Sequence, residues 1–188
     1  YLTLDRHYEA EQIRAFATIV RNDHLIYGHK PVHWCLDCKS ALAEAEVEYI
    51  DKESCSVDVR FRIIDNHEFL TRTGLNLDQT DLPIYLPIWT TTLWTLPASQ
   101  AVVLGEDLNY LLIATESDQG PYLVIVSEGL QESIRDRWQA EKWNVIGSVN
   151  PSDLDGLQLQ HPFYERQVPT LIGDYVTLDA GTGAVHTA

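Results

Sequence analysis

The chain has 188 residues, and 45% of them are hydrophobic, enough to fill the core of one large domain or two small ones. Its 13 basic and 28 acidic residues give a formal net charge of −15. Such a surface repels a phosphate backbone, so composition argues against broad nucleic-acid binding. The sequence shows neither an apolar run that would span a bilayer nor a charged-then-apolar leader, so nothing indicates export or membrane binding.

The cysteines and the chain ends add two expectations. Three cysteines (Cys35, Cys38 and Cys55) are too few and too unevenly placed for a disulfide framework, which favours a reducing, cytoplasmic setting. Methionine is absent, and neither end resembles a natural terminus. We therefore expect the chain to be an excised piece of a longer protein.

The chain begins with the pattern of an amphipathic helix. Ile13, Phe16, Ala17 and Val20 recur at the spacing of one buried helical face, and Asp5 is a candidate N-cap. We predict one helix over about the first 25 residues.

Two period-two patterns follow. Glu44, Glu46 and Glu48 alternate with apolar residues, and residues 57–63 repeat the alternation. The pair predicts two antiparallel strands around a turn at residues 51–54. Residues 65–82 are polar and are predicted to form mainly a loop.

The remaining pattern is of many short strands. A helix is predicted to start at Ser127, with Leu130, Ile134 and Trp138 on one side. Many strands with few helices predict a mixed α/β, β-rich fold, a closed or partly closed β-barrel with peripheral helices. We place a boundary near residues 40–45, between a lead-in over 1–42 and a β-rich body over 43–188. The other predicted strands lie near 83–91, 100–104, 109–115 and 121–126, and short apolar runs follow near 143–149, 157–159, 168–172, 175–178 and 184–187.

The Cys-x-x-Cys pair at Cys35 and Cys38 has the spacing of a zinc knuckle. A structural zinc needs four ligands, and the sequence holds no second such pair. The pair is therefore either half of a zinc site completed elsewhere or two structurally idle thiols. A catalytic thiol pair is disfavoured, since no thioredoxin-like βαβ pattern surrounds it.

Two further stretches are candidates for a binding site. Thr90, Thr91 and Thr92 end a predicted strand, where they form either a plain β-branched strand end or the wall of a pocket. Near the end of the chain, a Gly-Thr-Gly turn precedes His186. The sequence has no glycine-rich phosphate loop and no nucleophile elbow. Four scattered histidines are predicted to be exposed and receive no role: His24, His29, His67 and His161.

These two stretches resemble a known family. Trp-Thr-Thr-Thr-Leu-Trp-Thr-Leu-Pro-Ala-Ser (89–99) and Gly-Thr-Gly-Ala-Val-His-Thr-Ala (181–188) are similar to the two peptides that line the editing pocket of isoleucyl-tRNA synthetases. Residues 30–49 resemble the segment leading into that domain in the bacterial enzymes. The leucyl and valyl enzymes resemble one another at Thr-Thr-Arg-Pro, so Thr-Thr-Thr-x-Trp-Thr with His186 favours the isoleucyl branch.

The resemblance implies a site that removes wrongly attached amino acids from tRNA. A hydrophobic pocket separates isoleucine from valine by only about 1–3 kcal/mol, so valine attached in error must be hydrolysed at a smaller site. The implied catalytic residues are Thr91, Thr92 and His186, with His186 excluding the larger side chain. The implied substrate-binding residues are Thr90, Trp94, Ser99 and Gly183.

The resemblance also implies cofactors and partners. Editing in this family needs no cofactor, and ATP and magnesium belong to the catalytic core of the full-length enzyme. The implied partners of a monomeric chain are the acceptor end of isoleucine tRNA carrying valine and the rest of the synthetase. The pocket would grip only the flexible tRNA end, which agrees with the acidic charge.

The sequence differs from the family pattern at two positions and lacks the last part of the family motif. Leu93 replaces the proline usual after the threonines, and Ser99 stands where many relatives carry asparagine. The family motif continues past Ala188 to an aspartate that anchors the substrate amino group, so we expect the chain to fold but to edit poorly. The alternatives are a valyl or leucyl editing domain and a non-catalytic, zinc-containing β-barrel binding module.

Overall fold

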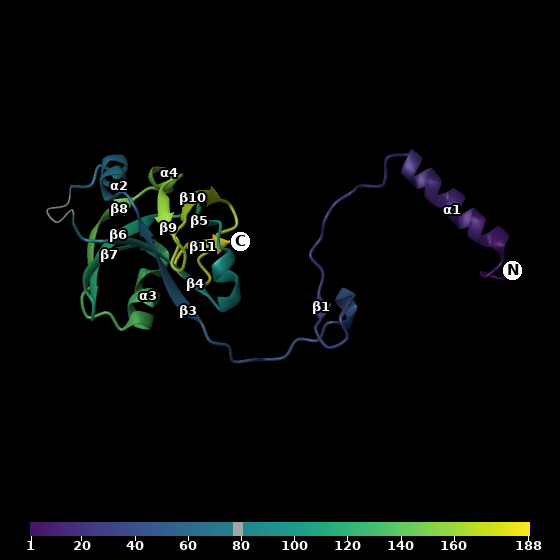
Figure 1. The fold of residues 1–188 in the computed structure, drawn as a ribbon, viewed down its shortest axis with the longest axis horizontal. Helices are drawn as coiled ribbons and strands as arrows, with labels where there is room; N and C mark the ends of the chain where they lie inside the picture. The colour runs from purple at the N-terminus through teal and green to yellow at the C-terminus, as the bar shows by residue number, and fades with distance from the viewer. Residues whose placement is uncertain (77–80) are drawn as a thin grey trace. The chain divides into compact units, whose positions relative to one another are not determined.

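The computed structural model describes residues 1–76 and 81–188 (Figure 1). The chain divides into two compact units, Tyr1–Lys52 and Glu53–Ala188. This division falls after Lys52, whereas the domain boundary predicted from the sequence falls after residue 42 and stays a prediction. Each unit is described by itself.

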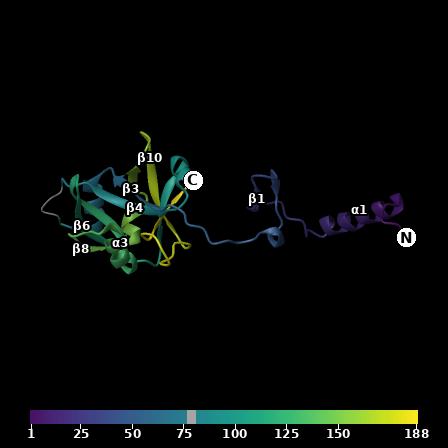
Figure 2. The ribbon, with the colours of Figure 1, turned by 90° about the horizontal axis from the view of Figure 1, so that it is seen from below.

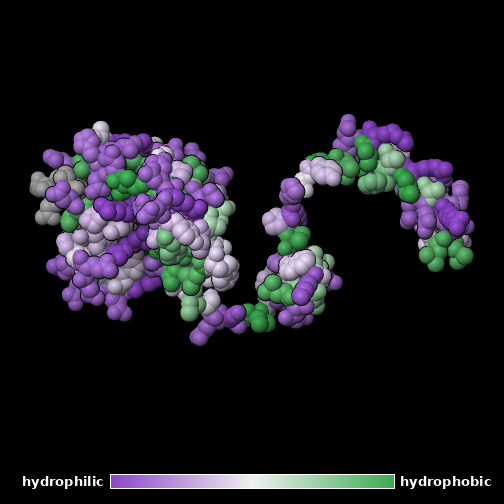
Figure 3. All heavy atoms as spheres, in the orientation of Figure 1, coloured by the Kyte–Doolittle hydropathy of each residue, from purple (hydrophilic) through white to green (hydrophobic). Residues whose placement is uncertain are grey.

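The first unit opens with helix α1, Arg6–Arg21. Its N-cap is Asp5, whose carboxylate accepts a hydrogen bond from the backbone N–H of His7 at 2.8 Å, so the predicted helix and cap are confirmed. The predicted burial is wrong for this unit, because Ile13 is 69% exposed and Phe16 54% exposed. Figure 3 shows hydrophobic residues on the surface of this unit beside hydrophilic ones.

After the helix, β1 (Trp34–Cys35) pairs with β2 (Ser40–Ala41) in an antiparallel hairpin. The 3₁₀ helix η1 then spans Glu44–Glu46, so the strand predicted from the alternating glutamates is wrong. The carboxylate of Glu46 accepts a hydrogen bond from the N–H of Ala43 at 2.8 Å. This local cap stabilises a helical turn, and glutamate has little preference for strands.

The second unit is built on one nine-stranded sheet (Figures 1 and 2). The strands predicted between residues 57 and 126 are confirmed within a few residues, and each of the later short apolar runs forms a strand except residues 175–178. In spatial order the strands run β11-β5-β10-β9-β3-β4-β7-β6-β8. Their bounds are β3 Val57–Ile63, β4 Ile84–Thr90, β5 Ala101–Gly105, β6 Tyr110–Ser117, β7 Gly120–Ser127, β8 Asn144–Val149, β9 Gln158–Gln160, β10 Gln167–Gly173 and β11 Ala184–Thr187.

The sheet is mixed and stays open. β4 pairs with β7, and β10 with β5, in parallel, while the other ladders are antiparallel. In the described residues β11 and β8 form the two edges, so a closed barrel is wrong, whereas the mixed, β-rich class is confirmed. β3 pairs with β4 and β9 instead of with the predicted strand at 44–49.

Both faces of the central strands are buried. In β6, Tyr110 and Leu112 enter the larger core, whereas Leu111 and Ile113 enter a second core on the opposite face. Helix α3 (Gln131–Trp138), preceded by the 3₁₀ helix η3 (Glu128–Leu130), covers the second core through Ile134. The helix predicted from Ser127 is therefore confirmed.

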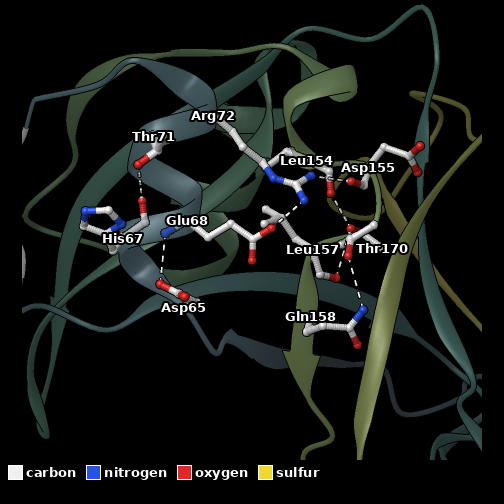
Figure 4. Close-up of polar contacts among 11 residues, drawn as sticks. Asp65, His67, Glu68, Thr71, Arg72, Leu154, Asp155, Leu157, Gln158 and Thr170 are labelled. Carbon is white, nitrogen blue, oxygen red and sulfur yellow. Dashed lines mark hydrogen bonds and ion pairs between the residues drawn. The ribbon is translucent and has the colours of Figure 1, made fainter.

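Helices α2 (Asn66–Thr73) and α4 (Pro151–Leu154) cover the larger core on the side of the sheet opposite α3 (Figure 1). The predicted loop over 65–82 is wrong where α2 lies, and its residues 77–80 are outside the described part. Asp65 accepts from the N–H of Glu68 at 2.9 Å as N-cap. Arg72 donates to the carbonyl of Asp155 at 2.6 Å, which ties α2 to the end of α4 (Figure 4).

None of the helices in the described parts of the chain combines the length and apolar character needed to cross a bilayer.

Candidate functional site

The threonine peptide forms a turn at the end of β4. The N–H of Thr92 donates to Oγ1 of Thr90 at 3.1 Å, and Oγ1 of Thr95 donates to the carbonyl of Thr92 at 2.7 Å. Such side-chain bonds to nearby backbone favour a turn over continued strand. The chain then enters the 3₁₀ helix η2, Leu93–Ala98, which leads into β5.

The Gly-Thr-Gly peptide is anchored to the sheet by its backbone and by one hydroxyl. Gly183 has φ +83°, in the left-handed region that favours glycine. Oγ1 of Thr182 donates to the carbonyl of Pro87 on β4 at 2.7 Å. The buried hydroxyl of Tyr110 donates to the carbonyl of Gly183 at 2.5 Å and accepts from the N–H of Gly105 at 2.8 Å.

The two peptides meet at His186. β11 lies antiparallel to β5, with His186 opposite Val102, so His186 lies beside the start of β5. Its Nδ1 lies 2.8 Å from Oγ of Ser99, and its Nε2 lies 3.5 Å from Oγ1 of Thr95, the outer limit of a hydrogen bond.

A row of hydroxyls continues from the imidazole to the strand end. Oγ1 of Thr95 lies 3.4 Å from Oγ1 of Thr92, which lies 3.1 Å from Oγ1 of Thr90. Each hydroxyl can both donate and accept, so this row can orient a polar ligand or a water.

The structure thus brings together four of the predicted site residues: Thr90, Thr92, Ser99 and His186. The carbonyl of the predicted residue Gly183 faces Tyr110. Thr91 is exposed, and Trp94 is 77% exposed at the start of η2. The roles of these residues in binding and catalysis stay predictions.

Burial affects the chemistry of the imidazole. It lowers the pKa of His186, so the ring is neutral at pH 7 and can both donate and accept a hydrogen bond. Ser99 and His186 form a serine–histidine pair, but Ser99 is 0% exposed. A nucleophile must reach the substrate, so this serine orients the ring instead of attacking a bond.

A cation from α3 supports the glycine peptide. Arg137 donates to both carboxylate oxygens of Asp58 at 2.9 and 2.7 Å, and to the carbonyl of Gly181 at 3.3 Å. The paired, planar geometry fixes the guanidinium. Sequence reasoning missed this contact, and also Thr95 and Tyr110, because no local pattern marks residues whose partners are distant in the chain.

His161 was predicted to be exposed, and this is wrong, because only 2% of it is exposed. Its ring packs edge-on against Phe61 and Phe163 and tilted against Tyr164. Burial is the main cause that lowers its pKa. The run His-Pro-Phe-Tyr between two short strands was the available signal, since neighbouring aromatic residues favour a packed ring.

Comparison with known proteins now defines the class. The family described as tRNA synthetases class I (I, L, M and V) matches residues 1–170, so the chain belongs to this family. Over its whole length it is 48% identical to the isoleucine–tRNA ligase of Nitrosococcus oceani and 50% identical to that of Proteus mirabilis. It spans about a fifth of these relatives, 20% and 19% of their length.

The fold is that of synthetase editing domains. The leucyl-tRNA synthetase editing domain of P. knowlesi superposes with a TM-score of 0.60 at 13% identity, covering 70% of this chain and 55% of that one. The leucyl-tRNA synthetase editing domain of P. falciparum superposes with a TM-score of 0.59 at 9% identity, covering 70% of this chain and 60% of that one. At these identities the likeness establishes the architecture alone.

Proposed function

We propose that this chain forms the editing site of a cytoplasmic isoleucyl-tRNA synthetase and hydrolyses valine attached in error to the isoleucine tRNA. The observation that supports this best is the meeting of two peptides remote in sequence, which places Thr92, Thr95 and Ser99 around His186. The similarity to isoleucine–tRNA ligases over all 188 residues supports the branch of the family.

The proposed chemistry is attack by a positioned water on the ester between valine and the terminal ribose. Oγ1 of Thr92 and the neighbouring threonine hydroxyls hold the water and the ribose hydroxyls through hydrogen bonds. The neutral imidazole of His186, fixed through Nδ1 by Ser99, presents Nε2 as a further polar group. No step needs a covalent intermediate on the chain.

Selectivity follows from size. His186 and the β-branched threonines narrow the site, so that valine enters and isoleucine, one methylene larger, is excluded. Steric exclusion of isoleucine gives a stronger discrimination than a hydrophobic pocket alone, since one methylene contributes only about 1–3 kcal/mol to binding. Trp94, exposed at the start of η2, is proposed to pack on the terminal adenosine.

The acidic charge is compatible with this partner if only the flexible acceptor end of the tRNA enters the site. The remainder of the synthetase would then supply the contacts to the phosphate backbone, and its catalytic core would use ATP and magnesium to charge the tRNA with isoleucine.

The proposal is tested by deacylation of valyl-tRNA for isoleucine. We define the chimera as the P. mirabilis relative carrying this chain in place of its matching segment. In the chimera, Thr92→Ala and His186→Ala are each expected to lower the hydrolysis rate about tenfold, the effect of losing one hydrogen bond in the transition state. His186→Ala is also expected to admit isoleucine, measured as hydrolysis of isoleucyl-tRNA.

The matched control is Thr71→Ala, which removes an exposed threonine hydroxyl on α2 and should leave the rate unchanged. Unaltered hydrolysis in both site variants would reject the assignment. Faster hydrolysis of mischarged threonyl- or methionyl-tRNA than of valyl-tRNA would instead favour a valyl or leucyl editing domain.

We also propose that Cys35 and Cys38 form half of a structural zinc site. The N–H of Cys38 donates to Sγ of Cys35 at 3.3 Å, an arrangement that favours thiolate, and this backbone bond is the largest cause lowering the pKa of Cys35. The described residues contain no cluster of three or more candidate ligands, so any further ligands would come from elsewhere.

Titration of the chain with Co²⁺, followed by thiolate-to-metal absorption, tests the half-site. Cys35→Ser is expected to remove the absorption, while Cys55→Ser, which changes an exposed cysteine outside the pair, should preserve it. Equal absorption in all three proteins would show that the pair binds no metal.

A further inference from the structure

The turn at residues 161–166, between β9 and β10, donates hydrogen bonds into the backbone of η2 and the residue after it. Nε2 of His161 lies 3.1 Å from the carbonyl of Leu96. Nη2 of Arg166 donates to the carbonyls of Pro97 at 2.9 Å and Ser99 at 2.5 Å. Two side chains from outside the site peptides thus hold three carbonyls of the segment that joins the threonine row to β5.

The tautomer of His161 is determined by its surroundings. Nδ1 accepts from the N–H of Phe163 at 3.1 Å and from that of Tyr164 at 3.2 Å, so it carries no proton. The neutral ring must then carry its proton on Nε2, which donates to Leu96. Packing against Phe61, Phe163 and Tyr164 also holds the ring of His161 in place.

The η2 segment needs such support. A 3₁₀ helix has poor hydrogen-bond geometry, and this one contains Pro97, which lacks an N–H. Leu93, at its start, does not fix a φ angle as a proline would. Pro97 therefore donates no backbone hydrogen bond to hold the last turn of this segment in place.

Ser99 transmits the position of this turn to the site. Its carbonyl accepts from Arg166, its N–H donates to the carbonyl of Leu96 at 3.1 Å, and its Oγ lies 2.8 Å from Nδ1 of His186. Movement of Leu96 or Ser99 would therefore turn or release the imidazole of His186.

We propose that His161 and Arg166 are positioning residues of the editing site, which hold the η2 backbone and, through Ser99, the ring of His186 in the orientation that binds the substrate. The identity of the substrate in this inference rests on the proposed function. The chain of contacts from His161 and Arg166 through Ser99 to His186 rests on the structure alone.

The test uses two substitutions of one residue in the 188-residue chain. His161→Asn keeps an acceptor near Nδ1 for the two turn amides but is too short to reach Leu96. His161→Gln places an N–H near Nε2 and keeps the bond to Leu96. The probe is valine joined to the ribose of adenosine by an amide, which resists hydrolysis. Binding and the titration of the His186 ring are both followed by NMR.

We expect His161→Asn to weaken probe binding about tenfold, as for one lost hydrogen bond, and to raise the titration midpoint of His186 as the ring gains water. His161→Gln should bind the probe within about twofold of the unsubstituted chain. Arg166→Gln, which loses the bonds to the carbonyls of Pro97 and Ser99, should weaken probe binding and raise the His186 midpoint in the same way. It replaces His161→Asn in the test if that variant does not fold.

Unchanged binding and an unchanged His186 titration in folded His161→Asn or Arg166→Gln would overturn the inference. Equal weakening by Asn and Gln would also overturn it, because ring packing instead of the Leu96 bond would then be responsible. If neither the unsubstituted chain nor the chimera binds the probe, the proposed function fails, and the His186 titration alone still decides the positioning role.

Discussion

Replacing Gly183 with alanine is expected to destabilise the second unit by about 3 kcal/mol, lowering its melting temperature by about 10 °C. Two costs add. At φ +83° a side chain is strained, and an added Cβ would lie 2.4 Å from Cβ of Ser127 and 3.4 Å from its backbone. The contact cannot be relieved by a flexible side-chain end, because Ser127 is buried at the end of β7. Urea denaturation measures the loss.

Gly156→Ala is the matched control. Gly156 has φ +75°, close to that of Gly183, but an added Cβ would meet nothing within 4 Å. The control therefore measures backbone strain alone, which costs about 1–2 kcal/mol. If the two variants lost the same stability, close packing of the glycine turn on Ser127 would be disproved.

The second large effect is expected for Tyr110→Phe, which should cost about 2–4 kcal/mol. Tyr110 is 0% exposed, so water cannot replace its hydroxyl. The substitution leaves the N–H of Gly105 and the carbonyl of Gly183 without the partner that joins them. Denaturation experiments measure this loss of stability. Because Gly183 is a proposed substrate-binding residue, Tyr110→Phe should also weaken binding of the probe.

The Tyr110 hydroxyl also makes the stability of the fold depend on pH in the alkaline range. Burial raises the pKa of Tyr110 from 10.0 to about 12. Between these values the unfolded chain releases the proton while the folded chain keeps it, so stability present below pH 10 is lost as the pH rises towards 12. Tyr110→Phe should lack this loss.

Tyr122→Phe is the control for Tyr110→Phe, because the ring of Tyr122 lies in the second core against Tyr85 and Arg60. It should change stability by about 0.5 kcal/mol or less and retain the alkaline loss. An equal loss in both variants would contradict the role assigned to the Tyr110 hydroxyl.

The strands were predictable because the sheet buries both faces of its central members. Continuous apolar runs such as those of β6 and β7 cannot be loops, and turn residues mark their ends. Helix α2 was missed because it buries only Phe69 completely and is otherwise polar. The glutamate alternation at 44–48 was misleading, since a single capping bond outweighs a weak strand pattern.

The candidate site was predictable only where residues cluster in the sequence. Thr90–Thr92 and the Gly-Thr-Gly-to-His186 stretch stand out as short motifs, and their resemblance to one family brought them together. No motif links the supporting residues Tyr110, His161 and Arg166 to the site, because their site contacts lie 65 to 73 residues away in the chain. Closed-barrel topology failed for a related reason, since pairing of the edge strands depends on curvature that no local pattern encodes.

The bonds that join the two site peptides have a consequence for how the site arises during folding. They span 87, 91 and 95 residues, from Ser99 and Thr95 to His186 and from Pro87 to Thr182. Closing loops of this length costs conformational entropy that only the completed sheet offsets. Under the proposed function, the hydrolytic site therefore forms only when β5 and β11 have paired, so a half-folded chain lacks it.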